Sequence, residues 1–252
     1  MPLVFAGLFG LLIGSFLNVC IYRLPRDLSI VWPASRCTSC GRELSWYENI
    51  PVFSYLALRA RCRSCGERIS QMYPLIEIAT ALIFAGSLAW YGLTPLFAVR
   101  LVFACAMVVL FVIDLQHQIL PNEITLPGIA IGLVASVFLE PGFRDALIGA
   151  VAGAGILWLI GWTYERLRHQ EGLGFGDVKM LAMIGAFLGW PSMLLTLVIA
   201  SFLGSLVGLS LIASRRGDLG STLPFGTFLA AAAIVAAVAG PDIIAWYAGF
   251  YR

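Results

Sequence analysis

The stretch LVFACAMVVLFVI, residues 101–113, carries no charged side chain and is followed directly by Asp114. It belongs to an apolar run that begins at Leu96, and that run approaches the roughly 20 residues of a membrane-spanning helix. Apolar runs of comparable length recur on both sides of it. They predict eight spans: Leu3–Tyr22, Leu75–Tyr91, Leu96–Ile113, Ile124–Leu139, Ala146–Thr163, Val178–Gly189, Ser192–Ala213 and Phe225–Tyr251.

The composition supports this prediction. Of the 252 residues, 60% are hydrophobic and only 12% are charged, whereas a soluble domain carries about 25% charged residues. We therefore expect an all-α polytopic membrane protein of about eight transmembrane helices, surrounded by lipid. The net charge of +2 gives no indication of a nucleic-acid partner.

The basic residues predict an orientation. Residues 23–73, between the first two spans, form the sizeable hydrophilic segment and carry eight arginines. Because short cytoplasmic loops are enriched in Lys and Arg, this insert should face the cytoplasm. Both termini then lie outside, and the loops at 114–123 and 164–179 and the turn with Arg215 and Arg216 lie inside.

Two C-x-x-C pairs stand in the insert, Cys37–Cys40 and Cys62–Cys65, with residues 41–61 between them. This spacing fits a four-thiolate zinc site. Four cysteines leave no open coordination position, so such a zinc would be structural. Two disulfides, a redox function or unliganded thiols are the alternatives, but a cytoplasmic location disfavours disulfides.

Two aspartates lie at predicted cytoplasmic ends of spans. Asp114 ends the third span, and Asp177 stands in a Gly-Phe-Gly-Asp motif before the sixth. A facing carboxylate pair can hydrolyse a peptide bond, with one member taking a proton from water and the other donating one. The alternative is that each aspartate is an interfacial helix cap. Asp177 fits that role at a helix N-terminus, whereas Asp114 lies at a C-terminus, where its charge opposes the helix dipole.

The ordered set of motifs resembles the type IV prepilin peptidases, also called prepilin leader peptidase/N-methyltransferases. Asp114, with its following Leu120-Pro121, is one match. The other matching stretches, in chain order, are Gly14–Val19, Arg23–Pro25, Arg36–Gly41, Trp46–Pro51, Cys62–Cys65, Tyr73–Glu77, Gly174–Lys179 and Pro224–Gly226.

The resemblance implies a bifunctional enzyme of the bacterial cytoplasmic (inner) membrane, with its active site facing the cytoplasm. Such enzymes cut the positively charged leader from prepilins or pseudopilins after a glycine. They then methylate the new N-terminal residue with S-adenosylmethionine. Asp114 and Asp177 match the catalytic pair, and Cys37, Cys40, Cys62 and Cys65 match the zinc ligands.

The resemblance also implies a division of the chain. It comprises a first helix at 1–22, a methyltransferase-associated zinc insert at 23–73 and a protease core at 74–252. It does not point to the residues that would bind S-adenosylmethionine.

This chain departs from the family pattern in several places. Residues Leu58–Arg61 stand where the family usually has glycine, and Gln71-Met72 stand where it usually has a basic residue. Thr227 follows Gly226 where the family usually has proline. Because the first two departures lie in the insert, methylation is a less secure expectation than proteolysis.

Other polar residues have ordinary interpretations. Lys179 could pair with Asp177 or extend to the interface. Asn122 and Glu123 are expected to cap the fourth span. Glu77 lies in the first turn of the second span, where an acidic residue is common. Alternatively, it could have a role toward the basic leader or the methyl donor.

Two other functional classes remain open from the residues. A proton- or cation-coupled transporter could use the aspartates as a relay, but a relay favours carboxylates deeper within the spans. A binding scaffold that docks a secretion partner through the insert leaves both aspartates unexplained. The oligomeric state is not predicted.

Overall fold

The computed structural model describes residues 1–169, 174–214 and 223–250. Arg215, Arg216 and the predicted end of the last span at Tyr251 lie outside the described residues. Two compact units are present, Met1–Val109 and Leu110–Arg252. The described elements, in chain order, are α1 Pro2–Arg23, η1 Leu24–Arg26, η2 Trp46–Asn49, α2 Phe53–Ala57, α3 Met72–Tyr91, α4 Pro95–His117, α5 Asn122–Ala135, α6 Phe143–Arg168, α7 Phe175–Ala213 and α8 Phe225–Gly249.

The described chain is helical throughout its apolar runs, which confirms the predicted fold class. Six helices are long and apolar enough to cross a membrane: α1, α3, α4, α6, α7 and α8. The predicted fourth span corresponds to α5, which is shorter than expected because its helix ends at Ala135 and tighter turns follow.

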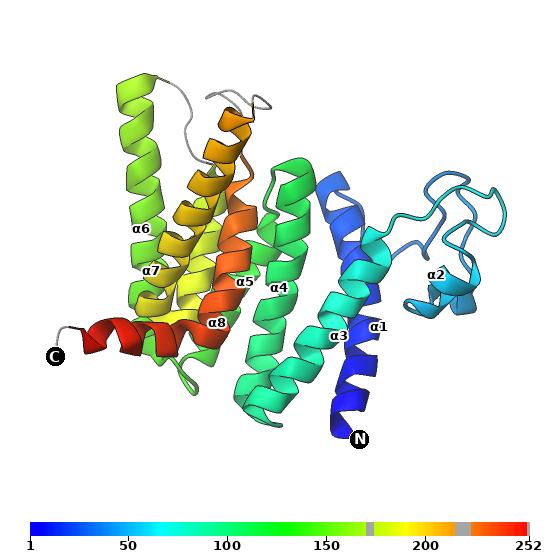
Figure 1. Ribbon diagram of the computed structural model, residues 1–252, viewed down its shortest axis with the longest axis horizontal. Coiled ribbons are helices and arrows are strands. Elements are labelled where there is room, and N and C mark those ends of the chain that lie inside the picture. Colours follow the sequence, from blue (N-terminus) through cyan, green and yellow to red (C-terminus); the bar gives the residue numbers. More distant parts are fainter. Residues whose placement is uncertain (170–173, 215–222, 251–252) are drawn as a thin grey trace. The chain divides into compact units, whose positions relative to one another are not determined.

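Helix α7 contains both the predicted sixth and seventh spans. Its 39 residues are interrupted at Gly189, whose backbone has φ 77° and ψ 168°. A residue with a side chain rarely adopts this conformation, whereas glycine does so without a steric penalty. Pro191 follows two residues later and cannot continue the preceding helical hydrogen bonds. The two halves of α7 consequently run in opposite directions (Figure 1).

In the first unit, α1 packs against α3 in an antiparallel arrangement. A methyl group on Gly14 would lie 2.7 Å from the Cα of Glu77, so only glycine permits this approach. The side chain of Asn18 donates a hydrogen bond to the carbonyl of Tyr73 (3.1 Å). This contact lies about one turn from the Gly14 contact on α1.

In the second unit, the first half of α7 is the central helix. It packs against α5 and α6, and the second half of α7 packs against α8. The backbones of Gly149 on α6 and Gly185 on α7 approach so closely that neither position has room for a methyl group. Van der Waals contact between close-packed backbones is what holds membrane helices together, because lipid supplies no hydrophobic driving force.

Candidate active site and metal centre

Asp114 lies in the last turn of α4 and is buried, with 4% of its surface exposed. Its Oδ2 accepts two hydrogen bonds from Thr227, one from the backbone N–H (2.6 Å) and one from the hydroxyl (3.0 Å). The carboxyl carbon also lies against Gly226, where an added methyl would stand 3.1 Å away. Oδ2 of Asp114 is therefore held by two hydrogen bonds, whereas Oδ1 receives no hydrogen bond from another side chain or backbone group among the described residues.

Thr227 is the third residue of α8, a position whose N–H has no partner within its own helix. Asp114 supplies that partner from another helix. Its negative charge opposes the dipole of α4 but is stabilised by the positive end of α8. The sequence identified Thr227 only as a departure from the family pattern, because nothing local shows that the start of α8 meets the end of α4.

Asp177 is the third residue of α7 and is half-buried. The charge of Asp114 acts on it electrostatically. Leu120 packs close to the backbone beside each aspartate, since a methyl group added to either Gly176 or Gly226 would lie 2.9 Å from its side chain. The structure thus brings both predicted aspartates to one site at helix ends. This position at the helix ends does not match the proton or cation relay of a transporter, which would place the carboxylates deeper within the spans.

Lys179 does not pair with Asp177. Its ammonium group donates a hydrogen bond to the side-chain oxygen of Asn122 at the start of α5. The expectation that Asn122 caps α5 is wrong as well, because the N-cap residue is Pro121 and no side chain caps the helix. The Lys179–Asn122 bond links the N-terminal parts of α7 and α5, two residues beyond Asp177.

The four predicted cysteine ligands form one cluster. Their sulfur atoms all lie within 4.8 Å of one another, and the Sγ atoms of Cys37 and Cys65 are 3.8 Å apart. A zinc ion with Zn–S distances of about 2.3 Å requires sulfurs separated by about 3.8 Å at the corners of a tetrahedron. The cluster is therefore the right size for one tetrahedral metal ion.

The two C-x-x-C turns have the same backbone structure. In each, the first cysteine's carbonyl accepts the N–H of the following glycine at 3.0 Å, Gly41 in one turn and Gly66 in the other. Both glycines have positive φ, 70° and 72°, which glycine adopts without strain. The turns direct both sulfurs of each pair to one side.

The backbone of each turn stabilises thiolates. The N–H groups of Cys65 and Ser64 lower the pKa of the Cys62 thiol to about 6, and those of Cys40 and Ser39 lower the pKa of Cys37. The four thiols cannot all lose their protons without a compensating charge. A divalent cation at their centre would supply it, so the donor set fits a thiolate-bound metal.

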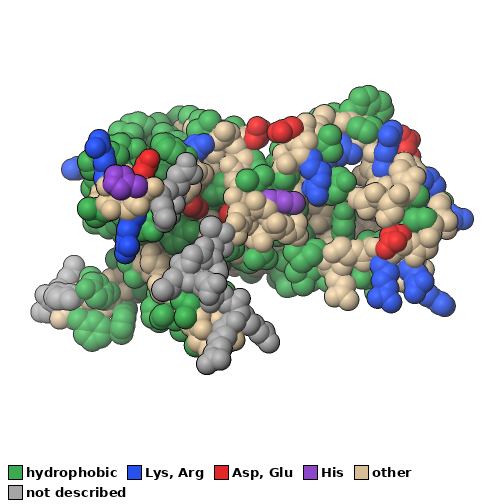
Figure 2. Space-filling view, turned by 90° about the horizontal axis from the view of Figure 1, so that it is seen from above, with side chains coloured by type: hydrophobic (Ala, Val, Ile, Leu, Met, Phe, Trp, Pro, Cys, Tyr) green, Lys and Arg blue, Asp and Glu red, His purple; other side chains and the backbone are tan. Residues whose placement is uncertain are grey.

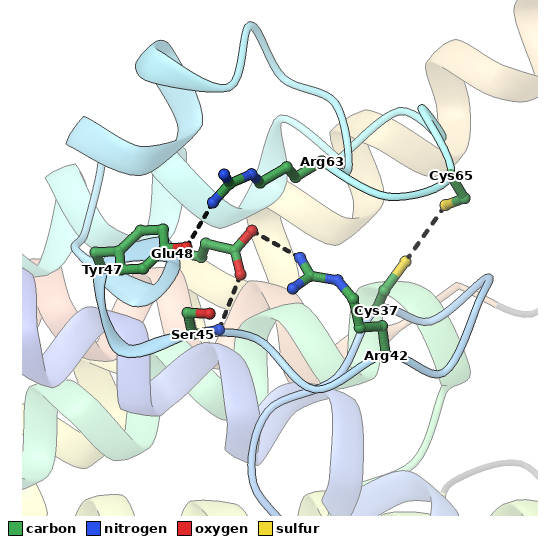
Figure 3. Close-up of polar contacts among 7 residues, drawn as sticks. All are labelled: Cys37, Arg42, Ser45, Tyr47, Glu48, Arg63 and Cys65. Carbon is green, nitrogen blue, oxygen red and sulfur yellow. Dashed lines mark hydrogen bonds and ion pairs between the residues drawn. The ribbon is translucent and has the colours of Figure 1, made fainter.

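A polar network supports both turns (Figure 3). Glu48 in η2 is almost fully buried and accepts hydrogen bonds from the Arg42 guanidinium (2.7 Å) and the Ser45 backbone N–H (2.8 Å). The neighbouring Tyr47 accepts a hydrogen bond from Arg63. Arg42 follows the first cysteine turn and Arg63 lies within the second, so η2 is tied to both.

We expect Glu48→Gln to destabilise the insert by roughly 1–3 kcal/mol, because Arg42 then loses its charged partner in a buried place. The side-chain hydrogen bond with Arg42, and then the N–H of Ser45, lower the pKa of Glu48. Its stabilisation is therefore complete above the ordinary glutamate pKa of about 4.3 and is lost as pH falls through the lower folded-state value. Hydrogen exchange at residues 45–50 measures the change.

Glu43→Gln is the matched control. Glu43 pairs with Arg36 at 2.8 Å, but both side chains are about half-exposed, and such pairs contribute about 0–1 kcal/mol. If residues 45–50 were equally protected from hydrogen exchange in the two variants, the structural importance of the Glu48 network would be contradicted.

Glu77 has a partner that sequence analysis missed. It is buried, and its Oε2 accepts the backbone N–H of Val52 at 2.7 Å. Val52 has φ 60° and ψ −47° at the start of α2, a conformation that is costly for a β-branched residue. Glu77 thus ties the insert to α3, a contact across 25 residues with no local signal.

Two protein-family models match consecutive stretches of the chain. Residues 8–91 match the bacterial peptidase A24 N-terminal domain, and residues 101–209 match the type IV leader peptidase family. No solved structure matches the chain.

Three curated relatives cover nearly the whole chain, and each is named prepilin leader peptidase/N-methyltransferase. The protein of Pseudomonas putida is 40% identical over 95% of this chain and 91% of its own length. That of Pseudomonas aeruginosa is 38% identical over 96% and 92%. That of Stutzerimonas stutzeri is 37% identical over 100% and 96%. With two family models matched in succession and relatives of this identity over more than nine-tenths of their length, the chain belongs to the type IV leader peptidase family.

Proposed function

We propose that this protein removes the leader peptide from type IV prepilins or pseudopilins at the cytoplasmic face of a bacterial inner membrane, with Asp114 and Asp177 as the catalytic pair. The proposal rests on the placement of these two carboxylates at the ends of α4 and α7, on either side of Leu120 and within electrostatic reach of one another. Family membership supports the leader peptidase activity and does not support the transporter alternative.

The two aspartates have different surroundings, which suggests which of them accepts a proton and which donates one. The hydrogen bonds that Asp114 accepts through Oδ2, and the N-terminus of α8, favour its ionised form. Asp114 then accepts a proton through Oδ1 from the attacking water. Asp177 is the protonated member and donates its proton to the carbonyl oxygen of the scissile peptide. The tetrahedral intermediate collapses when Asp114 gives the proton it took from water to the leaving amine and Asp177 takes a proton back from the gem-diol hydroxyl, which restores both groups.

The second proposed activity is methylation of the new N-terminal residue, with S-adenosylmethionine as methyl donor. The relatives' names include this activity. We assign it to the insert at 23–73, and the metal held by its four cysteines is proposed to be structural zinc. We propose the orientation that the basic residues predict, with the insert facing the cytoplasm and both termini outside.

The two activities should be separable, because the aspartates and the cysteine cluster belong to different compact units. Purified enzyme is incubated with a prepilin, with and without S-adenosylmethionine, and the products are weighed by mass spectrometry. The parent should remove the leader and add one methyl group only when the donor is present. Asp177→Asn should leave prepilin uncut yet methylate a pilin that was cut beforehand.

Loss of both activities in a well-folded Asp177→Asn protein would argue against separate sites. A parent protein that leaves several prepilins and pseudopilins intact under these conditions would overturn the proposed function itself.

A further inference from the structure

The insert exposes a set of large apolar side chains on η2 and α2. The exposed fractions are 80% for Trp46, 67% for Phe53 and 67% for Leu56, and Ile50 between the two helices is 37% exposed. Phe53 and Leu56 are three residues apart on α2 and therefore share one face. We call these four residues the η2–α2 face. A water-facing segment seldom carries so many exposed large apolar groups together.

Hydrogen bonding fixes the level at which α2 begins. Val52, immediately before α2, bonds to Glu77, and the Cα of Glu77 packs against Gly14 of α1. Gly14 lies nine residues before the end of α1 at Arg23, which corresponds to about 13 Å along the helix axis. The start of α2 is thus alongside α1 and well inside its end, as Figure 1 also shows.

That level lies within the membrane. Helix α1 has 22 residues, a length of about 33 Å, which is close to the ~30 Å thickness of the hydrocarbon core. With α1 spanning the bilayer and its end at Arg23 at the boundary, a point about 13 Å inside that end lies in the hydrocarbon region. Interfacial helices characteristically bury their apolar side roughly 5–10 Å into the boundary between headgroups and acyl chains.

The charges of the insert suit an anionic lipid surface. Residues 23–73 hold eight arginines against four acidic residues, Asp27, Glu43, Glu48 and Glu67. Exposed Arg59 and Arg61 follow directly after α2. Figure 2 shows Lys and Arg side chains gathered on the part of the first unit that holds the insert. Basic side chains beside an apolar face are the pattern of membrane-surface segments.

We propose that the η2–α2 face lies in the lipid bilayer, with its four apolar side chains among the acyl chains of the leaflet that the insert faces and the neighbouring arginines at the headgroups. The insert is then a partly embedded element, and the cysteine cluster is held close to the membrane surface. The proposal does not depend on the enzymatic activity.

Site-specific photo-crosslinking tests the proposal on the full-length, metal-loaded protein in nanodiscs of phosphatidylcholine and phosphatidylglycerol. The photoreactive residue p-benzoylphenylalanine replaces Phe53, a conservative change. Leu82, 68% exposed on the spanning helix α3, is the lipid-facing control. Ser64, exposed within the second cysteine turn, is the water-facing control. Lipid adducts are counted by intact-protein mass spectrometry.

We expect lipid adducts at position 53 to be comparable with those at position 82 and at least about tenfold more frequent than at position 64, as interfacial insertion requires. Quenching of tryptophan fluorescence by brominated lipids should also decrease in Trp46→Phe. Adducts from position 53 to residues 110–252 would show that the face packs against the rest of the protein. Lipid adducts no more frequent than at position 64 would equally overturn the proposal.

Discussion

Asp114→Asn is expected to abolish prepilin cleavage, by roughly 10⁴-fold or more, without unfolding the protein. The amide oxygen of Asn can still accept the N–H and hydroxyl of Thr227, and Asn caps a helix N-terminus as well as Asp does. The chemistry is lost because an amide can neither take up nor release the proton at neutral pH. Single-turnover cleavage of a purified prepilin measures the effect.

Further variants separate catalysis from capping. The double Asn variant at positions 114 and 177 should be no slower than either single variant, because the two carboxyls act as one unit. Glutamate keeps the acid but displaces it by about a bond length, a shift that can cost about 100-fold. Since one carboxyl must be ionised and the other protonated, the cleavage rate should be bell-shaped against pH.

Methylation of a pilin that was cut beforehand, together with the thermal unfolding midpoint, serves as the folding control for these variants. An Asp114→Asn protein that folds normally and cleaves prepilin at nearly the parental rate would refute the mechanism.

Removal of the proposed metal should destabilise the insert strongly. We expect about one zinc per chain in the purified protein, and loss of that zinc with Cys62→Ser or a strong chelator. Structural zinc contributes of the order of 10 kcal/mol to the folding of small domains, and the insert has little other apolar core. Hydrogen exchange across residues 36–69 should therefore rise, cellular abundance should fall, and methylation should be lost before cleavage.

Cys105→Ala is the matched control, since Cys105 lies in α4 away from the cluster. It should leave the zinc content and the exchange of the insert unchanged. An ordered insert in metal-free protein with four reduced thiols would show that no metal is needed.

The parts of the fold and site that the sequence predicted depend on local patterns. Apolar length predicted the helices, and the C-x-x-C spacing predicted the cysteine cluster. The break after the sixth span was expected at Trp190–Pro191, and the backbone reverses at Gly189, within one residue of it. In these cases the residues that determine the structure are neighbours in the chain.

The parts that the sequence did not predict depend on contacts between distant residues. Thr227 meets Asp114 across 113 residues, and Lys179 meets Asn122 across 57. Pairing with Asp177 was one of two interpretations of Lys179, and neither named Asn122, because a long flexible side chain bonds to whichever acceptor the packing brings near. Such partners become visible only once the helices are placed.

The likeness of the two cysteine turns has a consequence for how the insert matures in the cell. Each turn closes with the same backbone hydrogen bonds and would contribute two of the four ligands of a bound metal ion. A newly made chain with one turn formed holds only two ligands and releases an ion quickly. If the cluster holds a metal, occupancy would become durable only when both halves close on the same ion, and assembly of the insert would be an all-or-none response to the local metal supply.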